Sequence, residues 1–532
     1  MKSYTDNMTL EEQIGQLLVV GFYSTSVPQT LRALIERYHV GGIILFSRNI
    51  QDNQQTLELT HNLQAIAKAS GHRYPLFIML DQENGSVRRL GQGATIFPGN
   101  MALGASGSEQ IAYDIARATG RELRALGINM NLAPVVDVNN NPANPVIGVR
   151  SFGEDPQQIA RLAVAAVKGY QAAGVISNLK HFPGHGDTSV DSHQALPTIP
   201  HTLERLEQVE LVPFKRCIDA GADSVMVAHI YFPQLMPDGA LPATVSPAIV
   251  QGLLRQHLGF DGMIVSDCME MKAASRTIGT ERGAVMALQA GIDLVLVSHH
   301  HRQQVGSLGA VQAAIQAGEL STETIRRAAE RVLRLKERTL SWDTDTPPTV
   351  PDWVGGETHH QLRDAAYALS TTLVKNDERL IPLHLQPDER ILVIYPQEAA
   401  TSEAEDKGQT PVSLATSIRQ RHPNTRDIAF PPEINETEHT TILRMAAESS
   451  LIIMATLNAN MDAQQRELMR QLLQSGRHVI GVAIRNPYDL LAFPELRTYL
   501  ATYEYTPPAL EAVVRVLFGE IEARGRLPVS LI

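Results

Sequence analysis

The chain has 532 residues, of which 43% are hydrophobic, 19% charged and 5% aromatic, and its formal net charge is −11. This composition is typical of a soluble globular protein, and the low aromatic share favours neither a base-stacking surface nor a membrane belt. The negative charge opposes binding to phosphate backbones, so we expect no nucleic-acid partner. At about 150 residues per domain the length predicts three to four domains, or two if one is a large α/β barrel, and we expect two.

The chain contains two cysteines, Cys217 and Cys268. Two thiols make neither a disulfide framework nor a cysteine-based zinc site, which favours a reducing compartment. Residues 1–9 have no apolar signal segment, and no stretch of about 18 uninterrupted apolar residues predicts a membrane span. We therefore expect a cytoplasmic protein without membrane contact, unless a leader was removed.

Eight short apolar runs alternate with amphipathic helical stretches in the first part of the chain. The runs lie at residues 17–22, 42–46, 76–81, 130–138, 175–180, 224–230, 263–267 and 294–298. Helical stretches lie at 28–38, 54–69, 109–126, 156–173, 203–220, 247–257, 280–290 and 323–340. Continuous Val, Ile and Leu runs joined by helices are typical of a parallel sheet covered on both faces. Eight such units predict a (β/α)₈ barrel of the TIM type.

A Pro-rich, apolar-poor stretch follows the barrel. Residues 343–360 predict a linker, which leaves a barrel domain at 1–342 and a second domain at 361–532. The second unit is expected to contain helices at 362–374, 413–421, 463–475 and 508–518, and strands at 391–395, 451–457, 479–484 and 499–503. Four strands interleaved with helices predict a three-layer αβα sandwich.

Polar side chains stand directly after several runs of the barrel. Asp81 ends the third run, Arg150 follows the fourth, His181 and His193 follow the fifth, and Asp267 closes the seventh. In a TIM barrel these strand ends meet at the rim where active sites are built. We therefore expect these side chains to converge.

The segment 180–193, KHFPGHGDTSVDSH, contains one Lys, three His and two Asp. Its Pro and Gly residues allow the loop to fold over the strand end and to direct these side chains into one cavity. The alternative is a solvated charged turn, which does not need a Pro-Gly-His-Gly core. Asp191 and His193 can pair so that the carboxylate orients the imidazole and raises its basicity, as proton transfer requires.

Two further strand ends carry candidate functional residues. Asp267 stands where an ionised carboxylate can act as a nucleophile in sugar chemistry, or it can simply cap the next helix. Asp81 and an Arg of the segment 81–89 can bind vicinal hydroxyls, or form an ordinary surface pair. Arg150 can act as a second clamp of this kind.

Three consecutive histidines, His299, His300 and His301, raise the question of a metal site. Consecutive residues rarely ligate one ion together, so this interpretation is weak. A metal-dependent barrel hydrolase also needs a His-x-His motif on an early strand, and the first run has none. We expect neither a metal nor another cofactor.

The segment 180–188, followed by Asp191-Ser192-His193, resembles the signature of the β-N-acetylglucosaminidase branch of glycoside hydrolase family 3. Other motifs similar to those of the family occur in the expected order, namely Asp81-Gln82-Glu83 with Arg89, Arg150-Ser151-Phe152-Gly153, and Ser266-Asp267 with Met271. The resemblance covers nearly the whole first domain. The second domain resembles the αβα domain of the family in its position and in its ending, 525–529.

The resemblance implies a retaining exo-β-N-acetylglucosaminidase of peptidoglycan recycling or chitin-type breakdown, which acts through a covalent glycosyl intermediate. It implies that Asp267 is the nucleophile and His193 the general acid/base, with Asp191 as its partner. The side chains implied to bind sugar hydroxyls are Asp81, Arg89, Arg150, Lys180 and His181. His185 is expected to hold the loop together, and the second domain to stabilise the barrel, wall the cleft or mediate association.

Three alternatives remain at this point. A phosphorylase would form the same intermediate and use phosphate in place of water, because a neutral or cationic His repels phosphate less than a Glu does. A non-catalytic sugar-binding protein would show no turnover. A metallohydrolase would be inhibited by a chelator.

Overall fold

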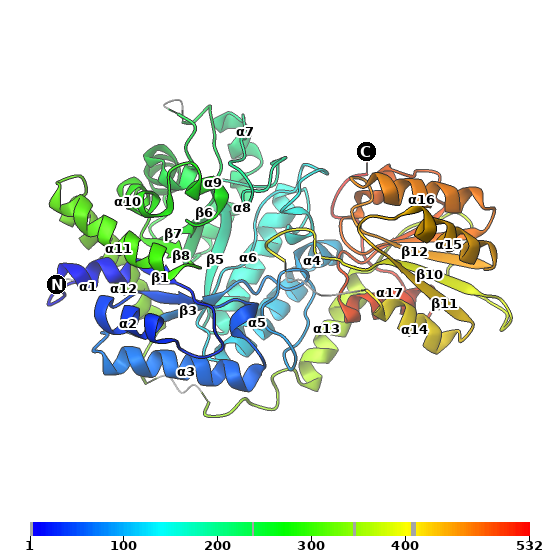
Figure 1. Cartoon of the computed structure of the whole chain (residues 1–532), viewed down its shortest axis with the longest axis horizontal. Coiled ribbons are helices and arrows are strands. Elements are labelled where there is room, and N and C mark those ends of the chain that lie inside the picture. The colour runs from blue at the N-terminus through cyan, green and yellow to red at the C-terminus, as the bar shows by residue number, and fades with distance from the viewer. Residues whose placement is uncertain (1–3, 237–238, 344–346, 406–410, 532) are drawn as a thin grey trace.

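The computed structural model describes residues 4–236, 239–343, 347–405 and 411–531. They form two domains that lie side by side along the long axis of the molecule (Figure 1). The barrel contains the N-terminal part of the chain, and the second domain contains the C-terminal part. The two-domain architecture expected from the sequence is thus confirmed.

Eight parallel strands close the barrel in chain order. They are β1 (Leu18–Val20), β2 (Gly42–Ile44), β3 (Phe77–Leu80), β4 (Met130–Asn131), β5 (Ile176–Phe182), β6 (Ser224–Val227), β7 (Met263–Cys268) and β8 (Leu294–Val297). Each strand overlaps one of the predicted apolar runs, and nearly all strand residues are buried. Strands covered on both faces are apolar throughout, which is why the sequence predicts them well.

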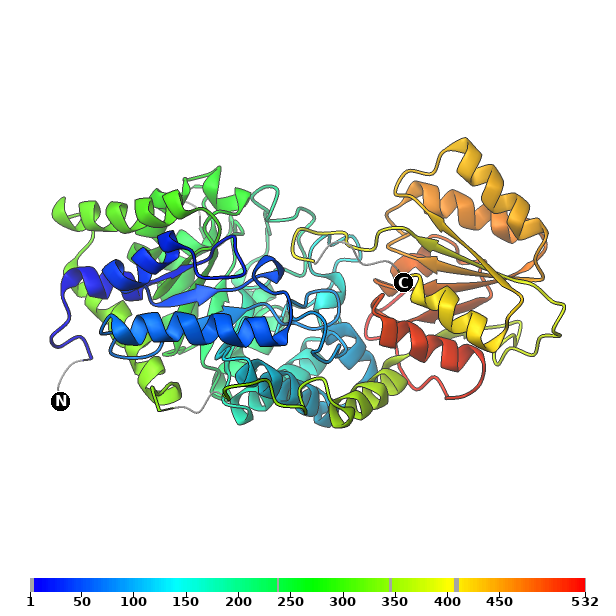
Figure 2. The ribbon, with the colours of Figure 1, turned by 60° about the horizontal axis from the view of Figure 1, so that its bottom comes forward.

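Helices surround this barrel (Figures 1 and 2). They are α1 (Leu10–Gln16), α2 (Gln29–Tyr38), α3 (Asn53–Ala69), α4 (Asn100–Ser106), α5 (Glu109–Ala125), α6 (Pro156–Ala172), α7 (Leu203–Gln208), α8 (Leu211–Asp219), α9 (Lys272–Ser275), α10 (Thr280–Ala290), α11 (His301–Gln316) and α12 (Thr322–Thr339), with a π-helical segment at Ala248–His257. Within the described part of the chain, none of the helices has the length and apolar character needed to cross a membrane.

The predicted helix at 203–220 is wrong, because the chain forms α7 and α8 there. A continuous helix would need a hydrogen bond from residue 213 to the carbonyl of Val209. Pro213 has no N–H to donate, and the backbone leaves the helical conformation at Val209, with φ −131° and ψ −76°.

The second domain is a six-stranded sheet with helices on both faces, which confirms the αβα sandwich. Its strands are β9 (Thr372–Asn376), β10 (Ile391–Pro396), β11 (Thr425–Phe430), β12 (Leu451–Thr456), β13 (His478–Ala483) and β14 (Thr498–Ala501), in the spatial order β11-β10-β12-β13-β14-β9. Its helices are α13 (Glu357–Ser370), α14 (Ser413–Arg421), α15 (Glu436–Ala447), α16 (Ala463–Gln474) and α17 (Pro507–Leu517). In Figure 1, α15 and α16 cover one face and α14 and α17 the other.

The sequence prediction lacks two of these strands, β9 and β11. β11 reads TRDIAF and lies at the sheet edge, where partial exposure removes the need for a continuous apolar run. β9 follows α13 without an intervening Pro or Gly, so the expected helix 362–374 continues too far. The helix ends at Ser370 and the strand begins at Thr372, where it pairs antiparallel with β14.

Loops of the barrel enter the core of the second domain. Met101, Ala102 and Ala105 of α4, and Val149 after β4, are buried together with apolar side chains of β10, β12 and β14. Arg526 N also donates to Ala105 O (2.9 Å). The junction therefore fixes the loop that carries Arg150.

The predicted linker 343–360 connects α12 and α13. Residues 344–346 of this linker lie outside the described residues. Val350 N donates to Gln54 Oε1 (3.3 Å), so the following part of the linker contacts α3. Residues 357–360 form the first turn of α13.

Candidate active site

A cavity of about 500 Å³ opens at the carboxyl ends of the barrel strands. The residues singled out from the sequence that line it are Asp81, Arg89, Arg150, Lys180, His181, His193 and Asp267. Asp191 lies beside His193 and bonds to its ring. Glu403, Ala404 and Glu405, from the loop after β10, form part of the wall. The second domain thus walls the cleft, which is one of the roles expected of it.

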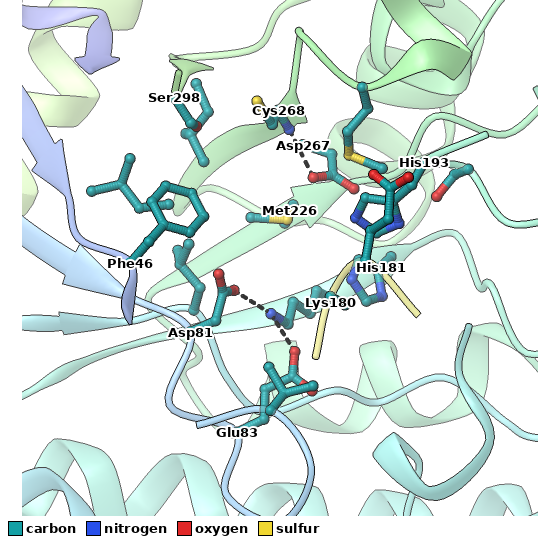
Figure 3. Close-up of a pocket in the computed structure, with 18 of the residues that line it drawn as sticks. Phe46, Asp81, Glu83, Lys180, His181, His193, Met226, Asp267, Cys268 and Ser298 are labelled. Atoms are coloured by element: carbon teal, nitrogen blue, oxygen red, sulfur yellow. Dashed lines mark hydrogen bonds and ion pairs between the residues drawn. The ribbon is translucent and has the colours of Figure 1, made fainter. Parts of the chain in front are cut away.

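Four charged side chains form a cluster on one side of this cavity, and Figure 3 labels three of them, Asp81, Glu83 and Lys180. Lys180 Nζ lies 2.7 Å from Asp81 Oδ1 and 2.7 Å from Glu83 Oε1. Glu83 also accepts hydrogen bonds from Arg150 Nε (2.9 Å) and Nη2 (2.8 Å). Burial raises the pKa of Glu83, but Arg150 and Lys180 lower it more strongly and hold it well below its usual range. Positive and negative side chains therefore alternate in the cluster, and each one is held in place by its oppositely charged neighbours.

The members of this cluster differ in their access to a ligand. The Asp81 side chain is 17% exposed, whereas those of Lys180 and Glu83 are 2% exposed, so Asp81 is the carboxylate of this cluster that is open to the cavity. Arg150 also donates from Nη1 to Val146 O (3.0 Å), and all its nitrogens therefore have protein partners. Its Nη2 also lies 3.3 Å from His181 Nε2, so the remaining N–H bond of Nη1 is the one left for a ligand.

Arg89 connects the cavity with the second domain. Its Nη2 donates to Ala404 O (3.0 Å) and lies 3.7 Å from Asp81 Oδ2. The guanidinium thereby holds the loop after β10 against the end of β3. Arg89 is buried, so this contact positions the loop in one place.

Asp267 stands at the end of β7 with its carboxylate in the cavity (Figure 3). Oδ1 accepts a hydrogen bond from Cys268 N (2.7 Å). Burial raises the pKa of Asp267, but the imidazoles of His229, His181 and His193 lower it by more, so the pKa lies below its usual value. Asp267 is therefore ionised at neutral pH, as a nucleophile must be.

His193 lies on the loop after β5 and lines the same cavity as Asp267 (Figure 3). Its Nδ1 lies 2.7 Å from Asp191 Oδ1, which also accepts from His193 N (2.9 Å). Burial raises the pKa of Asp191, but the hydrogen bond and charge of His193 lower it by more, so Asp191 stays ionised. Among the described residues Nε2 of His193 has no partner, which leaves it for proton transfer.

The loop that carries His193 is anchored to the segment after β4. Asp137 Oδ1 accepts from His185 N (2.7 Å), and Oδ2 lies 2.8 Å from His181 Nδ1. Asn144 Nδ2 donates to His185 O (2.9 Å). His185 makes the internal hydrogen bond expected of it, from Nδ1 to Thr188 Oγ1 (2.8 Å). Burial lowers the pKa of His185 to about 4, so its ring is neutral.

Two alternative interpretations of the sequence are not realised. Asp267 does not cap a helix, because α9 begins at Lys272 with Met271 as its N-cap residue. The three consecutive histidines diverge, since His300 Nδ1 bonds to Glu270 (2.8 Å) and His301 begins α11. No group of three or more potential metal-ligating side chains converges within the described ranges.

Sequence reasoning assigned no role to Glu83, Asp137 or Arg48, which all belong to the site or support it. Asp137 interrupts the apolar run 130–138, and a carboxylate inside a buried run indicates a functional or supporting role. Arg48 follows the second run just as the other rim residues follow theirs. The loop 403–405 has no such signal, because the packing of the second domain on the barrel brings it to the cavity.

An ionised carboxylate and an oriented imidazole that line one cavity of a TIM barrel supply the groups that cleavage of a glycosidic bond needs. The family model for the glycosyl hydrolase family 3 N-terminal domain matches residues 9–335, and that for the family 3 C-terminal domain matches residues 371–532. The chain therefore belongs to glycosyl hydrolase family 3.

Individual relatives match over the whole chain. Beta-hexosaminidase A of Pseudoalteromonas piscicida is 33% identical, over 98% of this chain and 97% of its own length. The solved structure of a family 3 β-N-acetylglucosaminidase from Paenibacillus sp. str. FPU-7 is 40% identical, with a TM-score of 0.92, over 98% of this chain and 99% of that one. A fungal multi-domain family 3 β-N-acetylglucosaminidase is 43% identical, with a TM-score of 0.93, over 98% of this chain and 61% of that one. The chain is an enzyme, a glycoside hydrolase of the β-hexosaminidase type.

Proposed function

We propose that this enzyme is a retaining exo-β-N-acetylglucosaminidase that releases terminal β-linked N-acetylglucosamine from peptidoglycan-type or chitin-type fragments. The observation that supports this most directly is that Asp267 and His193 line one cavity together with the cluster around Lys180. The names of the full-length relatives indicate the sugar. Asp81, which Lys180 holds in place, offers its carboxylate to the hydroxyls of that sugar.

In the first step, a carboxylate oxygen of Asp267 attacks C1 of the sugar. The bond from C1 to the leaving oxygen breaks, and the imidazolium of His193 gives its proton to that oxygen. The products are the free leaving group and a sugar covalently bound to Asp267. Asp191 stabilises the imidazolium before the transfer, because its carboxylate is bonded to Nδ1.

In the second step, neutral His193 takes a proton from water while the water oxygen attacks C1. The bond between C1 and Asp267 breaks, and the carboxylate returns to its ionised state. A carboxylate with a lowered pKa is a good leaving group here, because the cavity stabilises its charged form. The sugar leaves with the configuration it had in the substrate.

Replacement of the nucleophile tests this function. We expect Asp267→Asn to lower kcat/KM on an aryl β-N-acetylglucosaminide by about 10³-fold or more, with the fold retained. Asp114→Asn is the matched control, because Asp114 is on the outer helix α5 and should leave the rate unchanged. Near-parental turnover in Asp267→Asn would refute the assignment.

The role of His193 is tested with leaving groups of different acidity. In His193→Ala we expect a large loss of kcat/KM for a sugar leaving group and a much smaller one for an acidic phenol, because the phenolate leaves without a proton. An equal loss on both substrates would contradict the acid role.

Product analysis distinguishes the phosphorylase alternative. In phosphate buffer a phosphorylase would form sugar 1-phosphate, whereas a hydrolase forms the free sugar.

A further inference from the structure

A second cavity, of about 280 Å³, lies at the other end of the barrel from the candidate active site. Its wall includes Pro75 and Asn129, which come shortly before β3 and β4, so it opens at the amino ends of these strands. Side chains of α3, of the last turn of α5 and of the segment after α12 form the rest of the wall. The proposed hydrolysis makes no use of this cavity.

Three basic side chains and no acidic one line this cavity within the described part of the chain. They are His61 and Lys68 of α3 and Arg124 of α5. The two side-chain amides of the wall are already occupied, since Gln64 Nε2 and Asn129 Nδ2 each donate to a backbone carbonyl at 2.9 Å. The basic groups are therefore the ones left to bind a ligand.

Arg124 carries a charge that no described residue neutralises. Its side chain is partly buried, yet it has neither a hydrogen bond nor an ion pair with the part of the chain that the structure describes. Burial lowers the pKa of Arg124, and no carboxylate offsets this effect. Loss of hydration without a partner is unfavourable, so an anion in the cavity would stabilise this arrangement.

Capping of the helix ends does not account for the two longer basic side chains. Lys68 and Arg124 stand in the last turns of α3 and α5, where the helix dipole favours cations. The carbonyl groups there accept backbone N–H groups instead, as Lys68 O does from Gly71 N (3.2 Å) and Arg124 O from Gly127 N (3.1 Å). The dipole also acts on exposed side chains, so it requires no shared cavity.

An aromatic ring completes the cavity. Trp342, after α12, donates from Nε1 to Arg73 O (3.2 Å), which fixes the ring. Lys68 Nζ lies 5.8 Å from the centre of this ring, so a cation and an apolar face are neighbours. At roughly 30 Å³ for a water-sized group, the cavity has room for more than the five atoms of one phosphate group.

We propose that this cavity binds a phosphate monoester, with the phosphate held by Arg124 and Lys68 and the organic ring against Trp342. A guanidinium and an ammonium together match the two negative charges of the ester, whereas a carboxylate carries one. An aromatic face suits both a sugar ring and a base. Such an ester is a sugar phosphate or a nucleoside monophosphate, and the test separates these two sources.

Tryptophan fluorescence tests this site directly. The chain has two tryptophans, Trp342 and Trp353, so Trp353→Phe leaves Trp342 as the only reporter. In this variant, without phosphate buffer, we expect glucose 6-phosphate or adenosine 5′-monophosphate to change the emission with a Kd below about 1 mM. Glucose and adenosine, which lack the phosphate, should leave the emission unchanged. Calorimetric titration of the wild type should give the same Kd.

Two substitutions on α5 locate the phosphate. Arg124→Gln should raise the Kd by about tenfold or more, whereas Arg117→Gln, on the exposed side of the same helix, should leave it unchanged. Without ligand, Arg124→Gln should unfold at a temperature no lower than the wild type, because it removes an unpaired charge. The ester should raise the melting temperature of the wild type and not that of Arg124→Gln.

Four results would overturn the proposal. The first is that neither ester binds with a Kd below about 10 mM. The second is an unchanged Kd in Arg124→Gln, which would mean that the ester binds elsewhere, for example in the active site. The third is equal affinity for inorganic phosphate, which would leave Trp342 without a role. The fourth is equal affinity for glucuronate, which would replace the phosphate by a carboxylate. None of these results bears on the proposed hydrolysis.

Discussion

Lys180 is fixed between the carboxylates of Asp81 and Glu83, at 2.7 Å from each, in a place where its side chain is 2% exposed. Glu83 is fixed in turn by Arg150. A buried charge held by opposite charges on several sides has little freedom to reorient when a ligand arrives. Asp81, the more exposed member, is therefore held in a fixed orientation in the cavity, as the proposed binding of a sugar requires.

The first prediction concerns Glu83 and stability. Glu83→Gln leaves Lys180 and Arg150 short of a buried counter-charge, so we expect the free energy of unfolding at pH 7 to fall by about 3 kcal/mol or more. At pH 7 the contribution of Glu83 is fully present, because a carboxyl with a lowered pKa loses its contribution only in acid. Urea titration measures the change.

The control for this prediction is Glu36→Gln. Glu36 is paired with Arg32 on α2, where both side chains are 44% exposed, so we expect a change within about 0.5 kcal/mol. Equal losses in the two variants would show that the buried cluster does not stabilise the fold as described.

The second prediction concerns the protonation of Asp267, the proposed nucleophile. The pKa of Asp267 lies below its usual value of 3.8, so its carboxylate stays ionised throughout mild acid. In His193→Ala with an acidic phenol as leaving group, kcat/KM should therefore be constant from about pH 5 to pH 8, because the titrating imidazole is gone. A fall with a midpoint above pH 5 would contradict a lowered pKa.

At this scale the sequence predicted that polar side chains at the strand ends converge. Asp81, Lys180, His193 and Asp267 share one cavity because motif residues at the ends of parallel strands must meet at one rim. Arg150 is an example of a contact that the sequence motifs do not predict. Its position at the rim follows from the chain order, but its engagement with Glu83 depends on three-dimensional contacts.

At the scale of single elements, the loop between β5 and α7 brings His193 into the cavity that Asp267 lines. Gly186 in this loop passes so close to the segment after β4 that a Cβ at this position would lie 1.7 Å from Val138 O. Asn144 Nδ2 donates to Gly186 O (2.8 Å) on the same side. The absence of a side chain at Gly186 therefore allows the loop to pack closely against Val138.

Gly186→Ala is the third prediction. The added methyl must push the loop away from Val138, so His193 is displaced and kcat/KM for a sugar leaving group should fall by about 100-fold. The loss should be smaller with an acidic phenol, which distinguishes a displaced acid from an unfolded enzyme. Gly309→Ala, at an open position of α11, should change neither rate. Wild-type rates in Gly186→Ala would show that the loop tolerates the displacement.

The elements themselves divide into predictable and unpredictable ones. The eight barrel strands appear in the sequence because burial on both faces demands uninterrupted apolar runs. The edge strands β11 and β9 are partly exposed, so they do not need an uninterrupted apolar run. The break between α7 and α8 depends on one proline inside an amphipathic pattern, and that pattern alone continues across it.

At the scale of the whole molecule, the second domain takes part in forming the cavity. Glu405, at the end of the described loop after β10, lines the cavity and bonds through Oε1 to Arg485 Nε (3.1 Å). Thr401 N donates to its other oxygen (2.6 Å). The pair of Glu405 and Arg485 is buried, so the loop that meets Arg89 is anchored in the core of the second domain.

The fourth prediction tests this coupling. Arg485→Ala leaves the carboxylate of Glu405 buried without its partner, so we expect about 3 kcal/mol less stability and a raised KM with a smaller change in kcat. In the control Arg497→Ala the replaced side chain is 68% exposed, so the stability and the KM should change little. A KM that is unchanged in Arg485→Ala would show that the loop does not help to bind the substrate.

The central claim is that Asp267 forms a covalent bond to the sugar. Incubation with a fluorinated N-acetylglucosamine analogue that slows release of the glycosyl group, followed by mass spectrometry of the intact chain and its peptides, tests this claim directly. The account predicts an increase of one glycosyl residue, located on the peptide that contains Asp267 and absent in Asp267→Asn. An adduct on another residue, or turnover of the analogue with inversion at C1, would contradict it.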